Sequence, residues 1–166
     1  IADNVSEISS YGLESELYYN YQNLSNYLNF SYQKSTTFQD DPIKGKLVLD
    51  TRLYPTYMVK FGSNFRVPEW FLNLNLEGKY ITSRIASDNN IRSNDPANLK
   101  EYSLSPYFLL DFTISSDNLN FISNHETKLT FKVANLLDQK YFFPGFKDYD
   151  IPALDRSFLL KVTQQF

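Results

Sequence analysis

The sequence predicts an all-β fold, an antiparallel up-and-down transmembrane β-barrel, from two observations. Apolar and polar residues alternate with a period of two over seven segments, and this alternation is typical of strands with one apolar and one polar face. The connections between these segments are alternately short and long. An up-and-down sheet would therefore place the long connections at one end and the short turns at the other.

The first four strands are predicted over 10–21, 24–36, 56–67 and 71–84. Gln22-Asn23 and Pro68-Glu69 are the tight turns of the two hairpins. Each strand presents an apolar row that alternates with polar residues. These rows are Tyr11, Leu13 and Leu17; Leu28, Phe30 and Tyr32; Tyr57, Val59, Phe61 and Phe65; and Leu72, Leu74, Leu76 and Tyr80.

The last three strands are predicted over 106–115, 127–140 and 154–166. Their apolar rows are Phe108, Leu110, Phe112 and Ile114; Leu129, Phe131 and Val133; and Phe158, Leu160, Val162 and Phe166. The intervening segments 37–55, 85–105 and 141–153 are long and polar, and we expect them to be loops.

Such half-apolar strands suit either a soluble sandwich, whose apolar faces pack together, or a barrel, whose apolar face meets lipid. Three features favour the barrel. The strands are about 10–13 residues long, close to the ~9–11 that cross a bilayer obliquely. Tyr and Phe gather near strand ends, and charges lie at mid-strand on the polar side. We expect these charges either to pair with one another or to contact a further part of the protein inside the barrel: Glu14, Glu16, Glu77, Lys79, Asp111 and Lys132.

Composition excludes several kinds of chemistry. The 166 residues carry a net charge of −3, which gives no basic surplus for nucleic-acid binding. There is no Cys and one His, so thiolate and multi-histidine metal sites cannot form within the chain. A Ser-His-Asp triad cannot be assembled convincingly around His125, and no glycine-rich phosphate loop exists. We expect neither an enzyme nor a cofactor.

Three stretches resemble TonB-dependent outer-membrane receptors. Gly12-Leu13-Glu14 is similar to the G-[VL]-E strand of that family. The run Val133-Ala134-Asn135-Leu136-Leu137-Asp138-Gln139-Lys140-Tyr141 is similar to its V-x-N-L-[LF]-D-x-x-Y signature. Arg156, Phe158 and the terminal Phe166 resemble its closing strand. The order and spacing of the three matches agree with the last third of such a receptor.

The resemblance implies the bacterial outer membrane as the location and a plug inside a barrel of about 22 strands. Bacterial single-chain barrels have even strand numbers, so seven strands cannot close in the usual way. We therefore expect residues 1–166 to be the C-terminal portion of the barrel. The implied partners are the plug and N-terminal strands, TonB–ExbB–ExbD acting through the plug, the barrel-assembly machinery, outer-membrane lipid and an extracellular small molecule such as a ferric siderophore.

The same orientation makes the long connections extracellular, where cationic and aromatic groups would suit a bulky anionic chelate. The predicted substrate-binding residues are Arg84, Arg92, Phe142, Phe143, Phe146, Lys147 and Tyr149. The predicted barrel-assembly signal is Phe158, Leu160, Val162 and Phe166.

A second hypothesis stays open, a small self-contained outer-membrane barrel with a structural or adhesive role. It requires an extra strand within 37–55 or 115–126 and a closed hydrogen-bond ladder.

Overall fold

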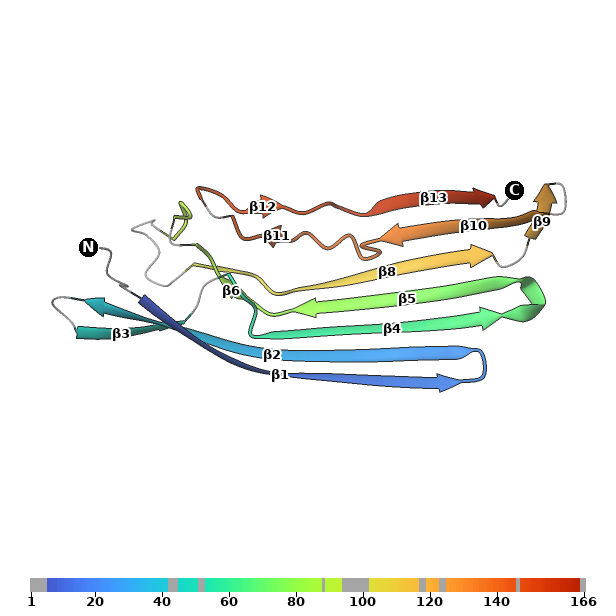
Figure 1. The fold of residues 1–166 in the computed structure, drawn as a ribbon. Helices are drawn as coiled ribbons and strands as arrows, with labels where there is room; N and C mark the ends of the chain where they lie inside the picture. The colour runs from blue at the N-terminus through green and yellow to red at the C-terminus, as the bar shows by residue number, and fades with distance from the viewer. Residues whose placement is uncertain are drawn as a thin grey trace.

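A computed structural model describes residues 6–41, 45–50, 53–87, 89–93, 102–116, 119–122, 125–145 and 147–164. These residues form β-strands, connecting turns and one short 3-10 helix, Pro68–Trp70. One antiparallel sheet dominates the molecule, as Figure 1 shows. The predicted all-β class is therefore confirmed. Within the described residues, no helix has the length and apolarity that a membrane crossing would need.

Seven strands follow one another across this sheet, each hydrogen-bonded to the next. They are β1 (Ser6–Tyr21), β2 (Leu24–Asp41), β4 (Tyr57–Val67), β5 (Leu72–Ile81), β8 (Tyr107–Ser116), β10 (His125–Ala134) and β13 (Ser157–Gln164). All seven correspond to predicted strands. β1 and β13 lie at opposite edges of the sheet and do not pair with each other. The described sheet is open, so the closed ladder of the self-contained barrel is not observed.

Six further strands lie outside these seven, all but the first residue of β6 in segments that we expected to be connections. β3 (Gly45–Asp50) pairs with the end of β2, and β9 (Leu119–Ile122) pairs with the start of β10. Two small hairpins stand apart from the main sheet: β6 (Arg84–Ile85) with β7 (Ser103–Leu104), and β11 (Phe142–Phe143) with β12 (Ile151–Pro152). The expectation that 37–55 is entirely a loop is therefore wrong, because β2 continues to Asp41 and turns back along β3.

Two predicted strands are shorter than expected. The segment 127–140 leaves the sheet after Ala134, because Asn135 adopts a left-handed conformation with φ of 54°. The segment 71–84 leaves it after Ile81, and Arg84 already belongs to the small hairpin β6–β7. In both cases the alternation already ends where the backbone leaves the sheet, since Thr82, Ser83 and Arg84 are all polar and Leu136 is followed directly by Leu137.

The strand register joins the apolar rows into one mostly apolar face, which Ser15, Asn26 and Ser63 interrupt on β1, β2 and β4. Phe65 pairs with Leu74, which pairs with Ile114; Ile114 pairs with Phe131, and Phe131 pairs with Leu160. This row crosses five strands without a polar interruption. Because side chains alternate along each strand, the neighbouring row lies on the other face. It contains Asn64, Asn75, Thr113, Lys132 and Leu159.

The apolar face is not covered by a second layer of the described residues. Leu13 is 61% exposed, Phe131 39% and Leu160 73%. The apolar residues that are buried number only five in the described part of the chain. They are Ile81, Ala86, Leu104, Tyr107 and Val133. A soluble sandwich would instead bury the middle of this face in a dry core.

Two glycines let aromatic rings lie flat against the sheet. A Cβ at Gly78 would collide with the ring of Phe61, its partner on β4. A Cβ at Gly62 would collide with the ring of Tyr27, its partner on β2. The first pair lies on the apolar face and the second on the polar face. On each face, an aromatic ring therefore packs over the backbone of a glycine.

Long and short connections lie at opposite ends of the sheet, as the sequence predicted. Gln22-Asn23, the short helix after β4, and the β9 segment lie at one end. β3, both small hairpins and the connections that carry them lie at the other (Figure 1). We call this second end the loop end.

Candidate ligand-binding site at the loop end

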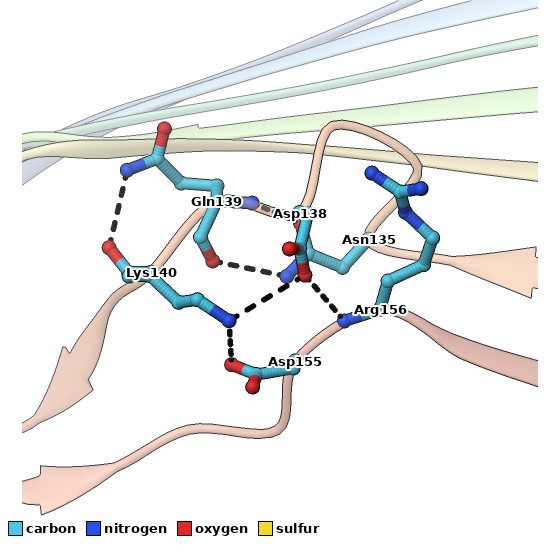
Figure 2. A network of polar contacts seen from close by, with 6 residues as sticks. All are labelled: Asn135, Asp138, Gln139, Lys140, Asp155 and Arg156. Atoms are coloured by element: carbon cyan, nitrogen blue, oxygen red, sulfur yellow. Dashed lines mark hydrogen bonds and ion pairs between the residues drawn. The ribbon is translucent and has the colours of Figure 1, made fainter.

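The run Asn135–Lys140 forms a tight turn closed by one side chain (Figure 2). The side-chain amide of Asn135 donates to the Gln139 carbonyl over 3.0 Å, and its oxygen accepts the Gln139 N–H over 2.9 Å. The Asp138 N–H donates to the Asn135 carbonyl over 2.9 Å. Asn is one of the few residues that tolerate the left-handed backbone required here. The part of the signature that begins at Asn135 is therefore a turn that ends β10.

This turn is fastened to the start of the last strand, as Figure 2 shows. The Arg156 N–H donates to Asp138 Oδ1 over 3.0 Å. Lys140 Nζ lies 2.7 Å from Asp155 Oδ1 and 3.6 Å from Asp138 Oδ1. The Arg156 N–H, together with the Lys140 ammonium, lowers the pKa of Asp138. The ion pair with Asp155 raises the pKa of Lys140.

An ion pair on the polar face extends the same network toward β8. Lys132 Nζ lies 2.9 Å from Asp111 Oδ2, so the expected pairing of these two mid-strand charges is confirmed. Asp111 Oδ1 also accepts the Asn135 N–H over 2.9 Å. One carboxylate therefore links β8 to β10 and to the turn that follows it.

A second network joins the two long connections that precede β8 and β13. Arg92 Nη1 donates to the Tyr102 hydroxyl over 3.0 Å, and its guanidinium lies 5.5 Å from the centre of that ring. The Tyr102 hydroxyl donates to Asp150 over 2.7 Å. Burial and the bond to Asp150 raise the pKa of Tyr102. The side chain of Asn90, which is fully buried, donates to the same carboxylate over 2.9 Å.

Backbone hydrogen bonds hold these two connections together. The Ile91 N–H donates to the Asp148 carbonyl over 2.7 Å, and the Asp148 N–H donates to the Asn89 carbonyl over 3.0 Å. Segments almost 60 residues apart in the sequence therefore form one rim.

Arg84 lies beneath this rim among aromatic rings. Its side chain is 6% exposed, and Nη2 donates to the Phe142 carbonyl over 3.0 Å. Its guanidinium lies 5.2 Å from the centre of the Tyr107 ring, and the Tyr107 and Tyr141 ring centres are 4.4 Å apart. Burial raises the pKa of the Tyr141 hydroxyl. In this structure Arg84 is a buried residue that holds the Phe142 backbone and the Tyr107 ring together.

A cleft of about 250 Å³ opens between the two connections. It is lined by Arg92, Tyr102, Lys140, Tyr141 and Phe142 together with segments 103–106 and Gln139. Two cationic residues and three aromatic residues therefore line one space, and the Lys140 ammonium is already paired with Asp155. Such a surface suits an anionic ligand with a flat or aromatic part.

The predicted binding residues are divided between this cleft and its surroundings. Arg92 and Phe142 line the cleft. Phe143, Lys147 and Tyr149 are exposed at the same end but do not line it. Phe146 and Phe166 lie outside the described residues. Of the predicted assembly signal, Phe158, Leu160 and Val162 are exposed on the apolar face of β13, at 66%, 73% and 63%.

Sequence reasoning missed the other lining residues, among them Tyr102, Lys140 and Tyr141. Both Lys140 and Tyr141 belong to the signature run. Lys140 falls in the predicted strand 127–140, which hid its place in the cleft, whereas Tyr141 falls in the predicted loop 141–153. Tyr102 has no distinguishing pattern in the sequence, since it depends on the distant Asp150 for its position. No group of three or more His, Cys, Asp or Glu side chains in the described part of the chain could hold a metal ion.

A scan of known protein families finds no model that matches this chain, and a search of curated proteins finds no match either.

Proposed function

We propose that this chain forms part of the barrel wall of a TonB-dependent outer-membrane receptor that imports a scarce extracellular nutrient such as a ferric siderophore. The observation that carries the proposal is the mostly apolar face. It runs across the sheet from β1 to β13, and its members are widely exposed. An exposed apolar patch of this extent marks an interaction surface, and hydrocarbon is the medium that matches it.

The two free edges of the sheet support a larger barrel. In lipid, each unpaired backbone group costs several kcal/mol, so a sheet that spans a membrane must close. The outer edges of β1 and β13 are unpaired within the described sheet. In the proposed receptor, further strands pair with both edges, and a plug packs against the polar face with its Asp111–Lys132 ion pair.

The turn Asn135–Lys140 supports the family resemblance on physical grounds. Asn135 and Asp138 each fill a position that another residue would fill poorly: one closes the turn and the other anchors Arg156. The hydrogen bonds of Asn135 and Asp138 therefore explain why an N-L-L-D run stands at the end of the penultimate strand. The plug, TonB–ExbB–ExbD and the barrel-assembly machinery are the partners that the proposal requires.

Uptake of radiolabelled iron chelates by cells that express the full-length receptor tests the proposal. We expect uptake that disappears when either the gene or TonB is deleted. Arg92→Ala should weaken ligand binding by about 10- to 150-fold, because a charged hydrogen-bond donor to the ligand is worth about 1.5–3 kcal/mol. Lys128→Ala, which removes the same charge near the short-turn end, is the matched control and should leave binding unchanged.

Two results would contradict the proposal in different ways. Recovery of the protein in the soluble fraction would contradict the proposed membrane barrel. Membrane insertion without any TonB-dependent uptake would be consistent with the barrel and would contradict the transport function.

A further inference from the structure

A second pocket, of about 430 Å³, lies at the loop end where β2 leaves its neighbour. β2 pairs with β4 from Leu24 to Tyr32 and with β3 from Thr36 to Asp41. Between these intervals, neither β4 nor β3 pairs with β2. The pocket occupies this break and is walled on its far side by the β6–β7 hairpin. Its volume is in the range of small-molecule sites.

Lys34 stands in this break on the apolar face of the sheet. It is two residues beyond Tyr32 and directly opposite Tyr11, both of which belong to the apolar row. Ser35 lies on the other face, where its hydroxyl is 2.6 Å from that of Ser10. Lys34 is exposed and forms no ion pair with a described carboxylate. Lys34 is therefore a cation without an ion-pair partner among the described residues, on the face that carries the apolar rows.

Tyrosines surround this cation. The rings of Tyr11 and Tyr32 lie 6.3 Å apart, and those of Tyr32 and Tyr57 lie 5.1 Å apart. Tyr32, Tyr57 and Tyr54 all line the pocket. Rings with an apolar body and a polar hydroxyl gather at the boundary between hydrocarbon and headgroups. Lys34, one step further toward the loop end, then lies at the level of the headgroups.

We propose that this pocket binds the phosphate group of a lipid headgroup in the leaflet at the loop end. The inference rests on the proposed function, because it needs the apolar face to lie in hydrocarbon. Lys34 supplies the positive charge, and the Tyr54 hydroxyl together with Ser103 supplies neutral donors on the wall. The acyl chains of the same lipid would run along the tyrosine row and the apolar residues below it. The pocket is separate from the cleft that contains Arg92, and the two share only Ser103.

Native mass spectrometry of the full-length protein in detergent tests this inference. The probes are phosphatidylglycerol, diacylglycerol, which lacks the phosphate, and inorganic phosphate, which lacks the acyl chains. We expect Lys34→Ala to weaken phosphatidylglycerol binding about fivefold, since one Lys near an anionic surface contributes about that much. Lys34→Arg should restore binding, Lys128→Ala should leave it unchanged, and diacylglycerol binding should not respond to Lys34.

Flotation of the same variants with phosphatidylglycerol vesicles separates the two proposals. Failure of the wild-type protein to insert would remove the proposed function. Insertion with equal phosphatidylglycerol binding by wild type and Lys34→Ala would overturn the lipid site alone. Binding of inorganic phosphate with the same dependence on Lys34 and the same affinity would also overturn it, because the acyl chains would then contribute nothing.

Discussion

Leu159 and Leu160 offer a direct comparison between the two faces of the sheet. They are neighbours on β13, at the same depth, with side chains on opposite faces. Leu160 continues the apolar row through Phe131, and Leu159 lies opposite Lys132 on the polar face. Both are largely exposed, at 73% and 55%. Replacing each by Arg introduces the same charge into two environments that differ only in the medium beyond the sheet.

The expected cost of Leu160→Arg differs between water and lipid. In water, Leu160 would lose about a quarter of the ~1.5–3 kcal/mol that full burial of a leucine gives, which is about 0.4–0.8 kcal/mol. On a lipid-facing barrel wall near the bilayer midplane, an Arg costs about 2–4 kcal/mol. We expect the larger value for Leu160→Arg. For Leu159→Arg we expect less than about 1 kcal/mol, because Asp111 already compensates Lys132.

The assay is equilibrium unfolding of the full-length protein reversibly folded into lipid vesicles. This setting excludes effects on cellular barrel assembly, in which Leu160 is a predicted participant. Equal costs for the two variants, both below about 1 kcal/mol, would refute the assignment of the apolar face to lipid.

Three further predictions concern the turn and the ring packing. Asn135→Ala should destabilise the protein by about 2–3 kcal/mol, from two lost hydrogen bonds and left-handed strain, and Asn135→Gly should recover about 1 kcal/mol in the same unfolding assay. Gly78→Ala should cost about 1–3 kcal/mol through its collision with Phe61, and a Phe61→Leu background should relieve most of this cost; additive effects would exclude the packing explanation. The lowered pKa of Asp138 means that its contribution is complete above its ordinary pKa of 3.8 and disappears as the pH falls through the lowered value. The Arg156 amide resonance should report this loss on acidification in the wild type and not in Asp138→Asn.

The alternation of apolar and polar residues was sufficient to predict the seven main strands and their order. It also predicted the side of each residue, because a period of two fixes the face once the register is known. The pairing of Asp111 with Lys132 followed from the same argument, since both charges were placed at mid-strand on the polar face.

The loop end could not be predicted in the same way. Its positions depend on pairs far apart in the sequence, such as Tyr102 with Asp150 and Arg84 with the Phe142 carbonyl. The predicted end of β10 was also wrong, although the alternation stops at Ala134. Asn135 ends β10 through a left-handed backbone and a side chain that bonds forward to Gln139, so the predicted strand ran six residues too far.

The medium at the apolar face can be measured directly by spin labelling, and residues 1–166 contain no Cys that would compete for the label. Single cysteines at successive positions from Leu129 to Lys132 on β10 would carry a spin label in the receptor reconstituted in vesicles. We expect the labels at 129 and 131 to collide with oxygen dissolved in the bilayer and to be shielded from a water-soluble relaxation agent, while those at 130 and 132 show the reverse. Equal access of the water-soluble agent to all four positions would contradict the assignment of the apolar face to lipid.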